Sequence, residues 1–214
     1  MHRPDLPPFQ GGAAGFFAYE LNRTLERLPA PGIRGEGLPQ SILNFYDVVV
    51  SFDHRHDRCW IVSTGWPEQD PQRRHERARR RAEEFASLLA SPRMQTNDLP
   101  APTGVWHSNF NREGYIAAVK RVIDLILDGD VFQANIAQRF SAALSTSFDS
   151  FGLYCRLRTL NPAPFGAFLH YGELTIASSS PERFLKLDGR LVETRPIKGT
   201  IARSADPQAR LAAR

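Results

Sequence analysis

A carboxylic acid and a lysine stand at the two ends of a stretch that has the pattern of a β-hairpin. Glu182 follows Ser-Ser-Ser-Pro after an apolar run, and Lys198 comes sixteen residues later in Pro-Ile-Lys-Gly-Thr. Hairpin pairing returns the chain to nearly the same sheet edge, so we expect the two side chains to lie close together. In a shared cleft the acid can donate a proton, while partial desolvation shifts the lysine toward its neutral, nucleophilic form. A surface ion pair near a turn is the alternative, and the spacing by itself favours that alternative.

The residues after the lysine suit the binding of a substrate carboxylate. Gly199 lets a ligand approach the backbone, and Thr200 offers a hydroxyl and an amide. The lysine is itself informative, because only three of the 27 basic residues are lysines and the other 24 are arginines. Lysine loses its proton far more readily than arginine does. Composition does not say which of the three, Lys120, Lys186 or Lys198, would act as a nucleophile.

Strands joined by turns must position these groups. Two hairpins are predicted, one over residues 165–179 with its turn at Gly172-Glu173 and one over residues 184–195 with its turn at 188–190. Apolar periodicity and capping residues predict the remaining elements, which are strands at 11–19, 46–52, 58–63 and 131–140 and helices at 71–90, 111–127 and 150–160. Residues 91–110 have the composition of a linker, and Val48, Val49 and Val50 are predicted to be buried. The pattern indicates an α+β fold of largely antiparallel sheets with flanking helices.

The bulk composition excludes some classes of protein. No apolar run approaches the roughly 20 residues that a membrane-spanning helix needs, so we expect a cytoplasmic protein with no membrane attachment. Cys59 and Cys155 have no metal-ligand spacing and are expected to be buried free thiols. His54 and His56 lie between two predicted strands, which favours a polar hairpin tip over a metal site.

The net charge of +4 and the pI near 9.4 raise the question of a nucleic-acid partner. Arginines crowd residues 73–81 of a predicted helix. No aromatic residues interleave with them, so a solvated helix face is the favoured interpretation and no nucleic acid is expected.

The string from Ser179 to Thr200 resembles the active-site signature of the chorismate-utilising enzymes, the anthranilate synthase component I-like family. Residues 111–140, which include GDVFQAN, are similar to the opening of that family's chorismate-binding region. Residues 11–28 and the segment YDVVVSF resemble its N-terminal region. The resemblance implies an anthranilate synthase component I-like fold, with residues 1–100 as a partial N-terminal region and 108–214 as the first part of the catalytic region.

Two positions distinguish branches of this family. Anthranilate synthases usually carry Ala where this sequence has Lys198, aminodeoxychorismate synthases carry Lys, and isochorismate and salicylate synthases use a lysine where this chain has Gln133. Both positions indicate the aminodeoxychorismate branch, which converts chorismate and glutamine-derived ammonia to 4-amino-4-deoxychorismate for p-aminobenzoate and folate biosynthesis. The resemblance then implies that Lys198 is the nucleophile, Glu182 the general acid, and Gly199 and Thr200 substrate-binding residues.

The same resemblance implies a bound Mg²⁺, a glutamine amidotransferase subunit as partner and chorismate as substrate. The family's Mg²⁺ glutamates would follow Arg214, so we expect no metal ligands in this chain and a fragment that is inactive alone. Two alternatives remain open. One is another chorismate enzyme, such as an anthranilate synthase component I with an unusual lysine, and the other is a non-catalytic basic binding module.

Overall fold

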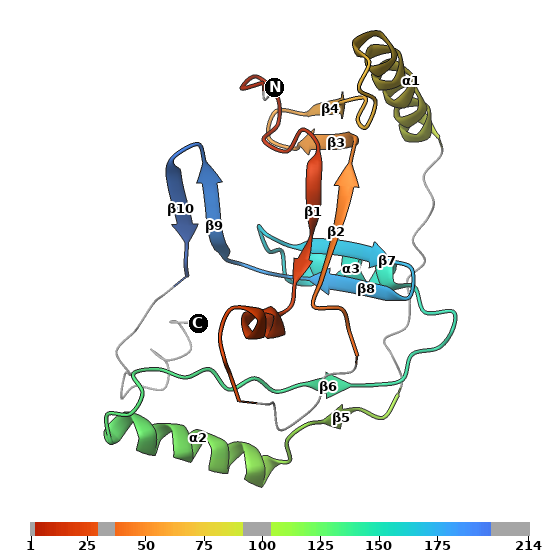
Figure 1. Cartoon of the computed structure of the whole chain (residues 1–214). Coiled ribbons are helices and arrows are strands. Elements are labelled where there is room, and N and C mark those ends of the chain that lie inside the picture. The colour runs from red at the N-terminus through yellow and green to blue at the C-terminus, as the bar shows by residue number, and fades with distance from the viewer. Residues whose placement is uncertain (1–2, 30–36, 92–103, 198–214) are drawn as a thin grey trace. The chain divides into compact units, whose positions relative to one another are not determined.

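The computed structural model describes residues 3–29, 37–91 and 104–197 (Figure 1). The chain divides into two compact units, Met1–Gln95 and Thr96–Arg214. The described residues form three α-helices and five two-stranded sheets, and every strand pair among them is antiparallel. The α+β fold predicted from the sequence is confirmed.

The first unit contains two hairpin-like strand pairs. These are β1 (Gly12–Phe17) with β2 (Ser41–Tyr46), and β3 (Val48–Asp53) with β4 (Arg58–Ser63), and a 3-10 helix spans Tyr19–Thr24. Gly15 allows β1 and β2 to approach closely, because a Cβ there would lie 1.8 Å from the carbonyl oxygen of Ile42. The single strand predicted over residues 46–52 is wrong in one respect. Tyr46 ends β2 and Val48 begins β3, so the chain changes partner at Asp47.

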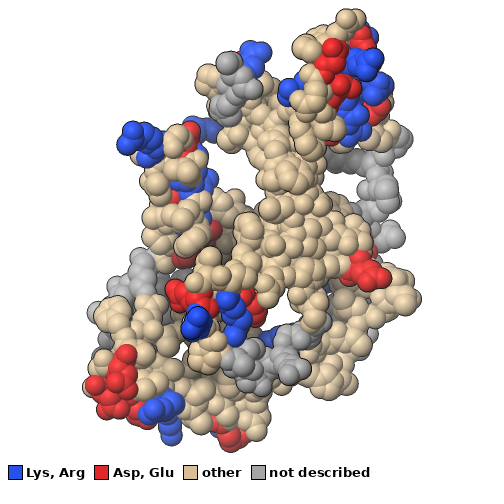
Figure 2. Space-filling model, in the orientation of Figure 1, with Lys and Arg blue, Asp and Glu red and all other residues tan. Residues whose placement is uncertain are grey.

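Helix α1 (Pro71–Ala90) begins and ends where the sequence predicts. Asp70 caps it by accepting a hydrogen bond from the backbone N–H of Arg73 across 2.9 Å, and Pro71 occupies the first turn. The helix contacts β4. Gly65, at φ +67°, lets the preceding loop approach the helix, because a Cβ there would lie 2.2 Å from the carbonyl oxygen of Arg74. Figure 2 shows basic and acidic side chains gathered together on α1.

The second unit opens with α2 (Arg112–Leu127), which Asn111 caps by accepting from the backbone N–H of Gly114 across 2.8 Å. The strand predicted over residues 131–140 is wrong. Only β6 (Phe140–Ser141) pairs, with β5 (His107–Ser108), a short strand inside the segment predicted to be a linker. Only the end of the segment lies beside this short strand, where the backbone N–H of Asn109 donates to the carbonyl oxygen of Arg139 across 3.1 Å, and residues 131–138 pair with no described strand.

The rest of the second unit agrees with the predicted elements. Helix α3 (Ser150–Leu160) precedes two hairpins, β7 (Ala167–Tyr171) with β8 (Leu174–Ser178), and β9 (Arg183–Asp188) with β10 (Leu191–Arg195). Both turns contain a glycine with positive φ, at +75° for Gly172 and +60° for Gly189. Helix α3 contacts β8, the strand that leads to Glu182.

Burial is slight over the described residues. Val48 is the one buried apolar residue among them, at 7% exposed, and Val49 and Val50 are half-buried.

The prediction of buried thiols is wrong for Cys59, which is exposed, while Cys155 is half-buried. His54 and His56 lie at a hairpin tip as predicted, where the Nδ1 atom of His56 is 2.7 Å from the carboxylate of Asp53. None of the described helices is long and apolar enough to cross a membrane.

Candidate active site

The β9–β10 hairpin brings Glu182 to the segment that leads to Lys198. Leu191 pairs with Asp188 beside the turn, and a bulge between Glu193 and Arg195 shifts the register so that Arg195 faces Arg183. Glu182 immediately precedes β9, and Pro196 and Ile197 immediately follow β10. The two segments therefore meet at the base of the hairpin.

A direct hydrogen bond joins the two segments. The Oε1 atom of Glu182 accepts from the backbone N–H of Ile197 across 2.8 Å. Within the described part of the chain, its Oε2 atom makes no hydrogen bond. One oxygen of this carboxylate is thus held by the backbone.

The remaining predicted site residues lie outside the described residues. Lys198, Gly199 and Thr200 follow Ile197 directly in the sequence. Their predicted roles as nucleophile and substrate-binding residues stay predictions. Gln133 is exposed in an irregular segment and does not lie in a strand.

The base of the hairpin also holds a charged cluster that the sequence analysis did not single out. The Arg183 guanidinium pairs with the carboxylate of Glu193, which Arg195 also approaches at 2.7 Å. The Arg183 guanidinium lies over the ring of Phe165, 5.0 Å from its centroid. Partial desolvation opposes the ionised form of Glu193, but the hydrogen bonds from Arg183 and Arg195 prevail and lower its pKa. Charged residues at both ends of a predicted hairpin were the signal that could have found this cluster.

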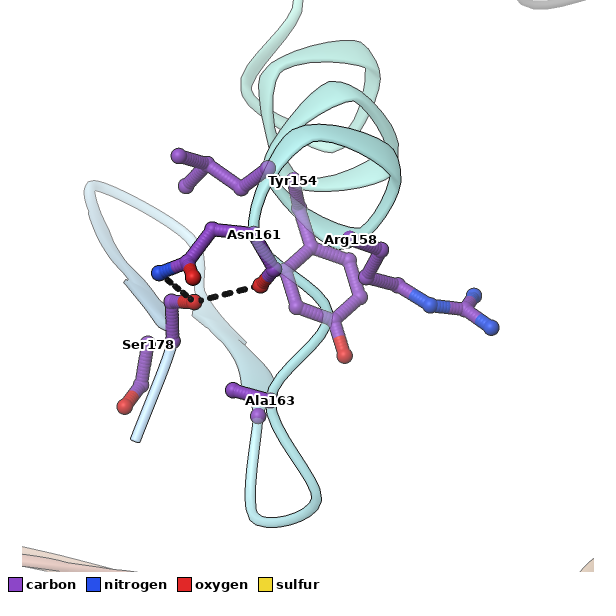
Figure 3. Close-up of a pocket in the computed structure, with 8 residues that line it drawn as sticks. Tyr154, Arg158, Asn161, Ala163 and Ser178 are labelled. Carbon is purple, nitrogen blue, oxygen red and sulfur yellow. Dashed lines mark hydrogen bonds between the residues drawn. The ribbon is translucent and has the colours of Figure 1, made fainter. Parts of the chain in front are cut away.

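A small cavity lies beside the turn between β8 and β9. Its volume is about 220 Å³, and Figure 3 shows the residues that line it, Asn161 and Arg158 among them. The side chains that line it come from α3, from the turn after α3 and from the end of β8: Tyr154, Leu157, Arg158, Asn161, Ala163, Gly166, Ser178 and Ser179. Ser178 and Ser179, at one side of this lining, belong to the segment that leads to Glu182.

No three His, Cys, Asp or Glu side chains gather closely enough to hold a metal ion among the described residues. The bound Mg²⁺ and the position of its ligands remain predictions. No step of the chemistry below is therefore assigned to a metal.

Comparisons with known proteins identify the family. A profile of chorismate binding enzymes matches residues 2–214. The chain is 38% identical over 212 residues to anthranilate synthase component 1 of Thermus thermophilus, covering 96% of this chain and 43% of that protein. It is 37% identical over 206 residues to aminodeoxychorismate synthase component 1 of Salmonella typhimurium, covering 96% of this chain and 41% of that protein.

A solved structure agrees with these matches. The crystal structure of anthranilate synthase component I from Streptococcus pneumoniae superposes with a TM-score of 0.76 at 25% identity, covering 89% of this chain and 43% of that one. The chain spans about two fifths of the length of the relatives it matches. The profile match over nearly all of its residues shows that this chain belongs to the family of chorismate binding enzymes.

Proposed function

We propose that this chain is part of the catalytic subunit of an aminodeoxychorismate synthase and that it carries the acid and the nucleophile of that enzyme. The observation that supports the proposal most is the hydrogen bond from the N–H of Ile197 to Glu182, at 2.8 Å. It brings the acid to the residue that precedes Lys198. An acid and an amine in neighbouring positions are what the replacement of a hydroxyl by an amine requires.

The proposed reaction has two displacements. The neutral amine of Lys198 attacks the chorismate ring and forms a C–N bond, while the C–O bond to the C4 hydroxyl breaks and Glu182 supplies the proton that lets it leave as water. Ammonia then forms a second C–N bond as the bond to Lys198 breaks, which restores the lysine amine. The new ammonium group returns a proton to Glu182, and the product is 4-amino-4-deoxychorismate.

The identity of two residues supports this branch of the family. Lys198 stands where anthranilate synthases usually carry Ala, and Gln133 stands where isochorismate and salicylate synthases use a lysine. Gly199 and Thr200 are proposed to bind a carboxylate of the substrate. Chorismate is a dianion, and the cluster of Arg183, Arg195 and Glu193 leaves one net positive charge at the base of the hairpin.

The source of ammonia is proposed to be a separate glutamine amidotransferase subunit, since the relatives are named component 1 of their synthases. Mg²⁺ is proposed as a companion of the dianionic substrate. A functional role in a cytoplasmic pathway of p-aminobenzoate synthesis follows from the same proposal.

Product analysis tests this proposal. The full-length gene product should be incubated with chorismate, Mg²⁺ and ammonium, and the products should be separated by liquid chromatography and mass spectrometry. We expect 4-amino-4-deoxychorismate. Formation of anthranilate would favour the second candidate, an anthranilate synthase, which the 38% identity to the Thermus thermophilus protein supports. Absence of both products, with chorismate intact, would contradict both candidates.

A further inference from the structure

The turn that carries Glu182 is tied to the turn that follows α3 by three hydrogen bonds. The Nδ2 atom of Asn161 donates to the Oγ atom of Ser179 across 3.1 Å, and that hydroxyl donates in turn to the carbonyl oxygen of Asn161 across 3.0 Å. The backbone N–H of Phe165 donates to the carbonyl oxygen of Ser180 across 3.1 Å. Figure 3 shows Asn161 with the two dashed contacts that the Ser179 hydroxyl makes. The two residues are 18 positions apart, so the contact fixes tertiary rather than local structure.

Only a short stretch of backbone joins this contact to the acid. Glu182 lies three residues after Ser179, and Pro181 between them has a φ that its ring holds near −65°. The hydroxyl of Ser180 also donates to the carbonyl oxygen of Glu182 across 3.3 Å. A displacement of Ser179 is therefore transmitted to Glu182 by a short and stiff stretch of backbone.

The carboxylate of Glu182 is held at its other end by the N–H of Ile197. The chain of contacts runs from Asn161 through Ser179 to Glu182 and from there to the backbone that leads into Lys198. Each contact is exposed to solvent, so each contributes little to the stability of the fold. Such contacts matter more for where a reacting group lies than for whether the chain folds, because small misplacements of a catalytic group are costly in rate.

We propose that Asn161 and Ser179 are positioning residues for Glu182, and through Glu182 for the backbone at Ile197. The proposal rests on the function proposed above in assigning Glu182 the role of general acid. The pair touches no reacting atom. It fixes the direction of the carboxylate, so that one oxygen stays on Ile197 and the other faces the substrate.

The test compares Ser179→Ala with Ser179→Thr in the full-length gene product. Without the hydroxyl, we expect kcat with ammonium to fall by about tenfold and KM for chorismate to stay within about twofold, because the loss concerns the transition state. Threonine keeps the hydroxyl and should restore most of kcat. Thr175→Ala is the matched control, since it removes a hydroxyl from β8, the strand that ends one residue before Ser179, and this hydroxyl contacts His170 instead. The control should leave kcat, KM and the unfolding midpoint unchanged.

A second measurement does not depend on turnover. Hydrogen exchange of the Ile197 amide, read by fragmentation mass spectrometry, should be about tenfold faster in Ser179→Ala and unchanged in Ser179→Thr and in Thr175→Ala. If Ser179→Ala does not fold, Asn161→Leu removes the side-chain amide of the pair at similar size and should give the same faster exchange. Normal kcat together with normal Ile197 exchange in Ser179→Ala would overturn the proposal. If the wild-type protein does not convert chorismate but Ser179→Ala still exchanges the Ile197 amide faster than the wild type, the proposed function is overturned and the positioning role stands.

Discussion

Asp47 and Arg81 are 34 residues apart in the sequence and are joined by two hydrogen bonds of 3.2 Å, one to each oxygen of the carboxylate. Arg77 donates a third, at 3.0 Å. Asp47 is the residue at which the chain leaves β2 and enters β3, and only 16% of its side chain is exposed. Hydrogen bonds from Arg81, and then from Arg77, lower the pKa of Asp47 against the opposing effect of burial. These contacts attach α1 to the sheet that it covers.

Replacing Asp47 should destabilise the first unit in a pH-dependent way. Asp47→Asn removes the charge that two arginines share, and we expect a loss of about 2 kcal/mol in the free energy of unfolding at pH 7. Because the pKa of Asp47 is lowered on folding, its contribution is fully present above the ordinary aspartate value of about 4 and is lost as pH falls through the lowered value. Denaturant unfolding curves of the variant and the wild type should therefore converge at acid pH.

Asp5→Asn is the matched control for that experiment. Asp5 also pairs with an arginine, Arg3, at 2.7 Å, but it is exposed to solvent. Its unfolding curve should superpose on that of the wild type at every pH, because exposed ion pairs contribute little. Equal effects of the two substitutions would show that the partly buried position of Asp47 does not matter.

The arginines of α1 should not bind nucleic acid. Arg74 and Arg77 donate to the carbonyl oxygens of Thr64 and Trp66, and Arg81 pairs with Asp47 and Glu84. Two further pairs lie along the helix, Arg79 with Glu83 and Arg80 with Glu84. Fluorescence anisotropy with a labelled DNA duplex, measured over a range of salt concentrations, should show no saturable binding. Binding that weakens steeply with salt would instead support the basic binding module.

Alanine substitution at two glycines with positive φ distinguishes the free-energy cost of backbone strain from that of a steric clash. Gly65→Ala places a Cβ 2.2 Å from the backbone of α1, whereas Gly37→Ala at φ +71° meets no atom of the described residues within 4 Å. We expect Gly37→Ala to cost about 1 kcal/mol from backbone strain alone. Gly65→Ala should cost at least about 3 kcal/mol, because the helix must move away from the loop. Similar unfolding midpoints for the two variants would mean that the contact between the loop and α1 is absent in solution.

Substitution of Lys198 tests its role as the nucleophile. Lys198→Arg keeps the charge and approximate size but cannot lose its proton at neutral pH, so kcat should fall by several orders of magnitude, as it should in Lys198→Ala. Arg would preserve much of the rate if the lysine acted only by its charge. Mass spectrometry of wild-type protein with chorismate and without ammonia should find an adduct on the peptide that contains Lys198. An active Lys198→Arg enzyme would rule out the covalent role.

The elements that sequence reasoning located well are those with local signals. Asp70, Asn111 and Asp149 each accept a hydrogen bond from the helix that follows, so the starts of α1, α2 and α3 could be read from the residue types. Gly172 and Gly189 likewise marked the turns of the two predicted hairpins. The approach of Glu182 to Ile197 followed from the second hairpin alone.

The errors concern features that depend on distant residues. Residues 131–138 have strand-like composition, but they pair with no strand in the part of the chain that the structure describes. Cys59 is apolar by type, yet it lies on β4 opposite the exposed Phe52. Charged residues at the ends of the predicted hairpin indicate a cluster, but they do not give the bulge between Glu193 and Arg195 or the register that places Arg195 opposite Arg183. Strand pairing and register depend on a second segment of the chain, so the periodicity of one strand does not determine them.

The β9–β10 hairpin places Phe184, Leu187 and Leu191 in water, with Phe184 86% exposed, while charged side chains such as Arg183 and Glu193 link its strands. The two kinds of interaction respond to salt in opposite directions. Dissolved ions screen exposed charges, whereas sulfate strengthens the association of apolar surfaces. Ammonium sulfate should therefore weaken the charge pairing inside this hairpin while it favours the association of Phe184, Leu187 and Leu191 with neighbouring molecules.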